Sequence, residues 1–195
     1  TPVIDSFVHD RYTTTEKELR RAITDIVHRS YDQLLMTSTE GTVSARVDEH
    51  SFLITPYGYD RKLLEPADLV LVREGRAEGG RPASRSARLH EAIYAAHRDL
   101  NAIIVAHPPA MMAFAVTHHR FDSRVIPESY ILLRDVQQVP YGVSYADFAA
   151  VVEALHPATP NLIVQNEALI TTGASLLEAF DRLEVAEYTA ESILW

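Results

Sequence analysis

Residues 101–108 of this chain read Asn-Ala-Ile-Ile-Val-Ala-His-Pro, and they are the strongest single indication of its fold. The apolar run 102–106 predicts a buried strand. His107 ends the run and is followed by Pro108 and Pro109, which are typical of a strand end. His107 therefore lies at a strand end, where a structural histidine can cap the turn.

Short apolar runs bounded by turn residues predict the other strands of a sheet. Two of these runs flank Asp48-Glu49-His50 and indicate a hairpin, and a third is closed by the turn Glu74-Gly75. The predicted strands cover residues 43–47, 51–55, 68–72, 136–141, 162–165 and 168–171.

Apolar residues at helical spacing predict the helices. The first begins in Thr13–Glu18, where Thr15 and Glu18 form a capping box, and it continues to about Met36. Further helices are predicted over residues 84–98, 109–117, 145–155 and 175–195.

Early hairpins followed by alternating strands and helices favour an α/β fold, a three-layer α/β/α sandwich with a mixed central sheet. We expect an N-terminal arm over residues 1–12 and a single domain over residues 13–195. Because Thr1 is not a methionine, we expect the chain to be part of a longer protein.

Composition excludes several classes of protein. The 195 residues carry 18 Lys+Arg against 27 Asp+Glu, a formal charge of −9, which argues against nucleic-acid binding. Cysteine is absent, so a disulfide framework, Cys-ligated zinc and a thiol nucleophile are excluded. No apolar run reaches the roughly 18 residues of a membrane span. We therefore expect a cytoplasmic protein with no nucleic-acid or membrane partner.

Several common catalytic motifs are missing. The chain has neither of the glycine-rich phosphate loops, GxGxxG and GxxxxGK[ST], and it has no GxSxG turn. His90-Glu91 begins an HExxH match, but Tyr94 stands in place of the second histidine. Dinucleotide enzymes, P-loop enzymes, α/β-hydrolases and zincins are therefore disfavoured.

Five segments stand out by their order and spacing. They are Thr39 to Arg46 (TEGTVSAR), Leu53 to Gly58 (LITPYG), Arg81 to Arg85 (RPASR), Asn101 to Pro108 (NAIIVAHP) and Gln165 to Ala168 (QNEA). Together they resemble the class II aldolase/adducin family, and the resemblance covers about residues 15–194.

This resemblance implies a mixed sheet between helices and a four-fold symmetric homotetramer. It also implies carbohydrate metabolism, in which small hydroxy-carbonyl compounds, often sugar phosphates, are cleaved or rearranged. In the catalytic members three histidines hold a divalent metal, commonly zinc, which polarises the carbonyl and stabilises an enediolate. A glutamate serves as acid/base, a tyrosine assists protonation, and loops of small residues hold the phosphate.

Three positions depart from that pattern. The family's His-x-His pair keeps only His107, because its first histidine is Val105 here, and Glu167 replaces the third metal-binding histidine. The metal candidates are therefore His107 and Glu167, with the triad incomplete at Val105. No cofactor is expected, although zinc or another divalent metal stays open.

Arg85 stands where the family has its acid/base glutamate, and a guanidinium cannot act as a base. At ~4 Å and an effective dielectric of about 20, it would also oppose a divalent ion by about 8 kcal/mol. We expect Arg85 to form an ion pair with Glu167 or Glu128 across the metal position.

The resemblance also assigns substrate contacts. Tyr130 falls where the family places its catalytic tyrosine, which acts at a neighbouring subunit's site, so Arg85 and Tyr130 are the catalytic candidates. With Arg85, the arginines at positions 61 and 134 are expected to form a pocket for a phosphate or carboxylate. The substrate-binding candidates are Thr39, Thr42, Ser44, Thr55, Gly58, Arg61, Ser84 and Arg134.

Two functions stay open. The first is a carbon–carbon lyase or isomerase of the aldehyde-lyase type, acting on a small phosphorylated or carboxylated hydroxy-carbonyl compound. It would use either a metal recruited through His107 and Glu167, or Arg85 as the electrophile with Tyr130 as proton donor. The second is a non-catalytic module, similar to the adducin head, that oligomerises or binds a small anionic metabolite.

Overall fold

A mixed sheet forms the middle of the molecule. In the computed structural model, which describes residues 4–195, its nine strands lie in the order β1-β5-β4-β3-β2-β6-β9-β8-β7. The pairs β1/β5 and β7/β8 are parallel, and the other neighbours are antiparallel. The strands are β1 (Ser6–Phe7), β2 (Thr42–Asp48), β3 (Ser51–Ile54), β4 (Val70–Arg73), β5 (Arg76–Glu78), β6 (Ala102–Ala106), β7 (Val136–Val139), β8 (Asn161–Val164) and β9 (Ala168–Gly173).

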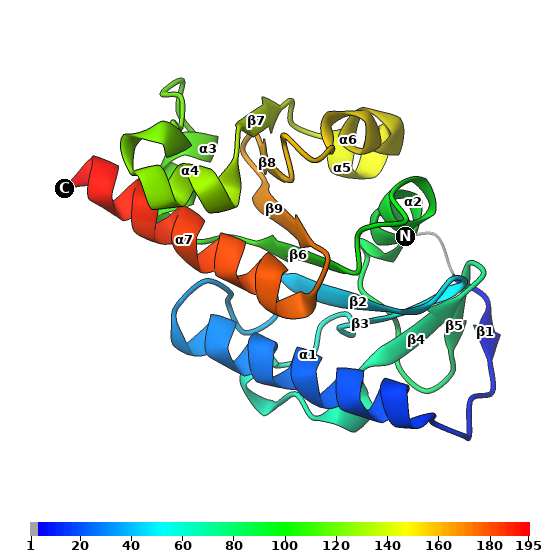
Figure 1. Cartoon of the computed structure of the whole chain (residues 1–195). Coiled ribbons are helices and arrows are strands. Elements are labelled where there is room, and N and C mark those ends of the chain that lie inside the picture. Colours follow the sequence, from blue (N-terminus) through cyan, green and yellow to red (C-terminus); the bar gives the residue numbers. More distant parts are fainter. Residues whose placement is uncertain (1–3) are drawn as a thin grey trace.

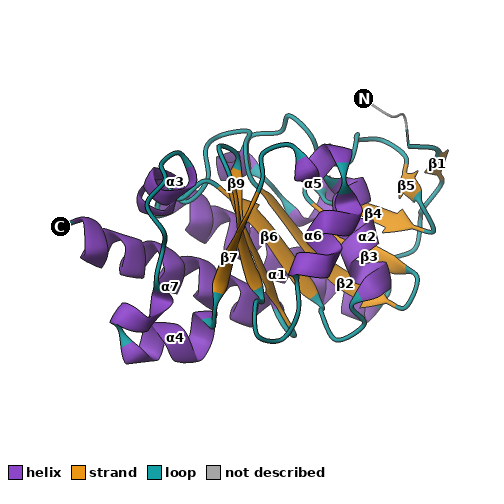
Figure 2. Cartoon of the chain, turned by 90° about the horizontal axis from the view of Figure 1, so that it is seen from above, coloured by secondary structure: helices purple, strands orange, loops and turns teal. Residues whose placement is uncertain are grey.

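Helices cover both faces of this sheet. One face packs against α1 (Thr14–Asp32), α3 (Pro109–Ala115), α4 (Pro127–Leu133) and α7 (Leu176–Leu194), and the other against α2 (Ala87–Ala96), α5 (Val143–Ala146) and α6 (Phe148–Ala154). Figure 1 shows the order of the elements, and Figure 2 shows α5 and α6 on the near side of the strands with α1 on the far side. The predicted three-layer α/β/α architecture with a mixed sheet is confirmed.

Strand β6 connects the two halves of the core. Ala102, Ile104 and Ala106 point into the α1/α7 layer, while Ile103 and Val105 point to the α2/α6 layer. This alternation follows from the two-residue period of a strand. Because both faces of the strand are covered, its sequence is a continuous apolar run, as parallel or fully buried strands usually are.

Several element boundaries differ from the predictions. The N-cap of α1 is Thr13, whose Oγ1 accepts the Glu16 amide at 3.1 Å, so the predicted Thr15/Glu18 capping box is wrong. The helix ends at Asp32, before Leu34 adopts a positive φ of 62°. The predicted helix 145–155 is divided into α5 and α6 at Asp147, whose side chain caps α6. Strand β5 was not predicted.

The N-terminal segment adds an edge to the sheet. Of the predicted arm, residues 1–3 lie outside the described residues, and β1 follows as a short strand beside β5. His9 Nε2 contacts both carboxylate oxygens of Glu16, at 3.0 and 2.9 Å. Arg20 donates to Glu16 at 2.8 Å and to Glu78 at 2.7 Å. These four side chains, the arm network, fasten the segment to α1 and β5.

Among the described helices, none combines the length and the apolar character that crossing a membrane requires.

Candidate functional site

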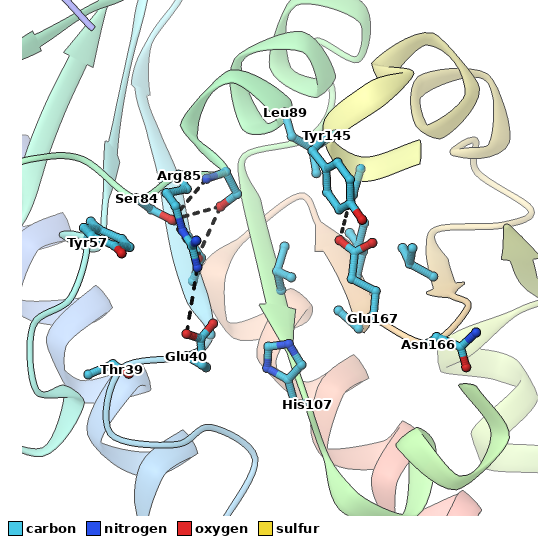
Figure 3. Close-up of a pocket in the computed structure, with 18 of the residues that line it drawn as sticks. Thr39, Glu40, Tyr57, Ser84, Arg85, Leu89, His107, Tyr145, Asn166 and Glu167 are labelled. Atoms are coloured by element: carbon cyan, nitrogen blue, oxygen red, sulfur yellow. Dashed lines mark hydrogen bonds and ion pairs between the residues drawn. The ribbon is translucent and has the colours of Figure 1, made fainter. Parts of the chain in front are cut away.

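A cavity of about 510 Å³ lies on the face of the sheet that carries α2 and α5. Its walls come from the loop before β2, the loop before α2, the end of β6, the turn between β8 and β9, and α5. In Figure 3, Arg85 and Glu40 lie on one side of it, Tyr145 and Glu167 lie on the opposite side, and His107 lies between them. Segments far apart in the chain therefore supply one site.

Three hydroxyl groups cluster at one end of this cavity. Thr42 Oγ1 lies 3.0 Å from Ser84 Oγ, which lies 3.0 Å from Ser86 Oγ, and Ser86 Oγ donates back to Thr42 Oγ1 at 3.3 Å. Thr42 begins β2, and Ser86 is the N-cap residue of α2. We call these residues the hydroxyl cluster. Hydroxyls at a helix N-terminus, where backbone amides are free, suit an anion.

Arg61 fixes the loop beside the hydroxyl cluster. Its guanidinium is buried, and its five N–H donors point to the carbonyls of Thr39, Gly41, Pro56 and Tyr59, at 2.8 to 3.3 Å. Burial lowers the pKa of Arg61, against the opposing effect of nearby carboxylates. No donor is left for a ligand, so the expected direct anion contact of Arg61 is replaced by a role in shaping the loop.

The loop that Arg61 fastens also depends on a glycine. Gly41 has a φ of +101°, and a Cβ there would lie 2.6 Å from Met36 Cγ. A side chain is therefore excluded both by backbone conformation and by space.

Arg85 is exposed at the mouth of the cavity. Its guanidinium lies 4.0 Å from Glu40 Oε1 and 5.0 Å from the centre of the Tyr57 ring. No ion pair forms with Glu167 or Glu128 among the described residues, so the predicted pairing is wrong. The predicted ion pair does not form because the two groups are too far apart: the turn that carries Glu167 lies across the cavity from the loop before α2.

His107 and Glu167 each present an unpaired buried atom to the cavity region. His107 Nδ1 and Glu167 Oε2 have no hydrogen-bond partner, while the other oxygen of Glu167 accepts the Ser144 hydroxyl. Burial lowers the pKa of His107, and the charges of Glu40 and Glu167 oppose this shift. The imidazole is therefore neutral at neutral pH and can accept or donate a proton.

The donor set of the cavity does not fit a metal site with three protein ligands. Val105 lines the cavity with an alkyl group at the position of the first ligand. Within residues 4–195, the only three histidine or acidic side chains with ligand atoms inside 4.8 Å of one another are His9, Glu16 and Glu78. That trio belongs to the arm network, where Arg20 already supplies the positive charge.

Of the other predicted site residues, some line the cavity and some lie buried behind it. Thr39 lines the cavity, whereas Ser44 lies buried below it and contacts His90 Nδ1 at 2.6 Å and the Tyr94 hydroxyl at 2.8 Å. Thr55 is buried and accepts the Val43 amide at 3.3 Å. Ser44 and Thr55 therefore support the cavity from behind.

Tyr130, Arg134 and Gly58 do not line the cavity. Tyr130 belongs to α4, where its ring faces Arg124 at 5.0 Å, and Arg134 follows as the C-cap residue. The expected convergence of three arginines is therefore wrong within one chain, because α4 packs on the opposite face of the sheet. Gly58 forms a turn with a φ of 66°.

Several polar residues that line the cavity were not predicted, among them Glu40, Ser86, Ser144 and Tyr145. Ser86 and Glu40 each neighbour a predicted residue, so proximity to the recognised segments was a usable signal. A hydrogen bond with Tyr141 raises the pKa of Tyr145 to about 12. Little in the sequence pointed to Ser144 and Tyr145. They lie outside the recognised segments, and they follow Gly142, whose φ of 91° turns the chain after β7.

The family described as Class II Aldolase and Adducin N-terminal domain matches residues 21–194. The match covers most of the chain, and the mixed sheet between helices agrees with the fold that the resemblance implies. The chain belongs to this family.

Known proteins align with this chain over 80–90% of their own length. An L-fuculose phosphate aldolase of Methanococcus maripaludis is 27% identical over 168 residues, covering 85% of this chain and 90% of the relative. A 3-oxo-tetronate 4-phosphate decarboxylase of Haemophilus influenzae is 26% identical over 176 residues, covering 83% and 80%. The crystal structure of YgbL from Escherichia coli superposes with a TM-score of 0.81 at 26% identity, covering 93% and 90%.

Proposed function

We propose that this chain is an aldehyde-lyase-type enzyme whose cavity binds a small phosphorylated hydroxy-carbonyl compound and cleaves or isomerises it. The observation that carries the proposal is the hydroxyl cluster of Thr42, Ser84 and Ser86, which opens into the same cavity as His107 and Glu167. The names of the aldolase and the decarboxylase among its relatives both specify a phosphorylated compound.

The hydroxyl cluster is the phosphate end in this proposal. Its three side chains hydrogen bond to one another, and each can turn a proton towards an incoming anion. Hydrogen bonds to a charged group contribute about 1.5–3 kcal/mol each. Arg85 adds a positive charge at the mouth, and the N-terminus of α2 adds its dipole.

The reacting end is the opposite wall. For aldol cleavage, a base takes the proton of the substrate hydroxyl, the carbon–carbon bond breaks, and its electron pair moves onto the carbonyl oxygen as an enediolate. Glu167 is our candidate base, because one of its oxygens is buried and unpaired. The neutral His107, which lies between the two walls, hydrogen bonds to the developing enediolate oxygen.

The proton that completes the reaction comes from Tyr130 of a neighbouring copy in this proposal. Tyr130 lies outside its own chain's cavity, on α4, which leaves it free to reach another site. We therefore propose a cytoplasmic homotetramer, as the family resemblance suggests. No step is assigned to a metal, since the donor set does not fit one.

A specific observation favours a second candidate, a non-catalytic anion-binding or oligomerisation module. Val105 and Arg85 remove two groups that metal-dependent members use. The two candidates share the phosphate end and differ in turnover.

Binding and turnover of phosphorylated ketoses separate these candidates. We expect calorimetry to show binding of ketose phosphates and none of the unphosphorylated ketoses, with Ser84→Ala weakening binding at least ~10-fold. Ser192→Ala is the matched control, because that hydroxyl donates to the Tyr188 carbonyl at the exposed C-terminal end of α7.

Product assays then decide the class. Release of an aldehyde from the bound compound supports the lyase, and binding without turnover supports the module. Elemental analysis of the same sample tests whether the cavity lacks the ligands for a metal, since one tightly held zinc per chain would contradict that conclusion. Absence of phosphate-dependent binding would contradict the lyase and the anion-binding module, and it would leave the oligomerisation module.

A further inference from the structure

A second cavity adjoins the first on the outer side of Arg85. It has a volume of about 520 Å³ and lies between β1, β5 and the loop before α2. Tyr57, Ser84 and Arg85 line both cavities, so these three residues form the wall between them. We call it the side cavity. Anything that binds at the hydroxyl cluster therefore lies one side chain away from it.

Arginines dominate the charge of the side cavity. Arg81, Arg85 and Arg88 line it within eight residues of chain, in a protein whose formal charge is −9. Glu78 is the acidic residue in its wall, and that carboxylate is already bound by Arg20 at 2.7 Å and by the Leu71 amide at 3.0 Å. The wall therefore presents more positive than negative charge.

The acidic partners of these arginines leave donors unused. Arg81 lies 2.7 Å from Asp68, and Arg88 lies 3.2 Å from Glu91. The contact of Arg85 with Glu40 is the longest of the three, at 4.0 Å. A guanidinium has five N–H donors. Arg61 shows the contrast, since all five of its donors are bound to carbonyls.

The backbone leaves space beside the arginines. A Cβ placed on Gly80 would meet no atom within 4 Å, and Ser6 of β1 supplies a small side chain to the same cavity. Tyr57 and Tyr59 stack under Arg85 and Arg81, at 5.0 and 4.4 Å from the ring centres. This stacking holds the guanidinium groups in place without consuming their donors.

We propose that the side cavity is a second anion subsite, so that the two cavities together bind a compound carrying two anionic groups. One group lies at the hydroxyl cluster, and the other lies among Arg81, Arg85 and Arg88. The proposal rests on the proposed function for the first group and specifies its substrate class. A bisphosphate and a phosphorylated carboxylic acid share the required chemistry.

The test compares ligands that differ by one anionic group, by calorimetry at constant ionic strength. The pairs are inorganic phosphate with pyrophosphate, and fructose 6-phosphate with fructose 1,6-bisphosphate. A phosphorylated sugar acid is added to separate the second phosphate from a carboxylate. We expect at least ~10-fold tighter binding of the doubly anionic member, about 1.4 kcal/mol.

Two variants locate the effect. Arg88→Gln removes one positive charge from the side cavity, and Ser6→Glu adds a negative charge at its exposed edge. Both should reduce the ratio of the two affinities towards one. Arg98→Gln makes the same change of net charge at an exposed arginine paired with Glu49, and it should leave the ratio unchanged.

The outcomes separate this proposal from the proposed function. Equal affinities for the singly and doubly anionic ligands, or a ratio that neither variant changes, would overturn the second subsite. If fructose 6-phosphate does not bind but pyrophosphate binds through Arg88, the proposed function fails and the subsite stands. If no ligand binds, both fail.

Discussion

Two regions of this molecule bring histidine and glutamate side chains together, and they differ in how those side chains are paired. In the arm network, Arg20 lies between Glu16 and Glu78, and His9 contacts Glu16. In the cavity, His107 Nδ1 and Glu167 Oε2 have no partner. The comparison shows that residue types alone do not mark a site, since the set that resembles metal ligands is the one whose side chains already have hydrogen-bond partners.

The first prediction breaks the arm network. Burial alone would lower the pKa of Arg20, but the hydrogen bonds that it donates to Glu78 and Glu16 outweigh burial and raise the pKa. Arg20→Met leaves two buried carboxylates without a cation, so we expect a loss of about 3–5 kcal/mol in the free energy of unfolding. Urea denaturation measures it. Arg98→Met should change stability by less than about 1 kcal/mol, because its ion pair is exposed.

If Arg20→Met lowers the free energy of unfolding by less than about 1 kcal/mol, Arg20 does not stabilise the two carboxylates of the arm network. The trio of His9, Glu16 and Glu78 would then deserve a direct test with divalent metals.

The second prediction concerns His90, a buried histidine without an acidic partner. Burial lowers its pKa to about 3, so between pH 3 and 6.5 the unfolded chain binds a proton that the folded chain does not. Stability from this group is therefore full above pH 6.5 and falls by about 1.4 kcal/mol per unit as the solution is acidified. Between pH 6.5 and 4.5, the wild type should lose about 2–3 kcal/mol more than His90→Gln.

Urea titrations at several pH values provide the measurement for His90. The exposed His50 offers a control, and His50→Gln should leave the pH dependence as it is in the wild type. Parallel curves for the wild type and His90→Gln would show that His90 is charged in the folded protein.

The third prediction concerns the loop behind the hydroxyl cluster. Lysine has three donors where Arg61 uses five, so Arg61→Lys should lower the free energy of unfolding by about 2 kcal/mol and weaken phosphate binding. Arg46→Lys is the matched control, because the guanidinium of Arg46 also donates to backbone carbonyls, three in its case, but lies away from the cavity. It should lose stability with no change in phosphate affinity, as calorimetry would show.

The two regions also differ in how far the sequence predicts them. The strands beside the cavity follow from apolar periodicity, and Thr42, Ser84, His107 and Glu167 follow from the recognised segments. The ion pair predicted for Arg85 was wrong for a physical reason. Arg85 stands where the family has a glutamate, and a residue of opposite charge need not keep the contacts of the residue that it replaces. Glu40 became the nearest acid to Arg85 only through the loop that Arg61 holds.

The arm network was beyond the sequence for a different reason. His9 precedes the first predicted helix, and Glu78 lies on a strand that the pattern did not show. Arg20 meets Glu78 across 58 residues of chain, and His9 follows β1, which pairs in parallel with β5 across about seventy residues. Nothing in local spacing indicates such a pairing, since strand pairing is set by the whole sheet.

The last prediction has the smallest effect on stability and separates the two regions most directly. Glu167→Gln keeps an oxygen that accepts the Ser144 hydroxyl, and the atom it changes has no partner. We therefore expect the free energy of unfolding to change by less than about 1 kcal/mol, while the rate of aldol cleavage falls at least ~100-fold because the base is gone.

Glu187→Gln is the opposite case and the control for Glu167→Gln. That buried carboxylate lies outside the cavity and accepts the amides of Ala110 and Met111 at 2.8 and 2.9 Å. Replacing one acceptor oxygen with a donor removes one of these bonds, so stability should fall by about 1–3 kcal/mol while the rate is kept. If both variants lose stability and keep the rate, Glu167 is a structural carboxylate like those of the arm network, and the base must be sought at Glu40, the other carboxylate that lines the cavity.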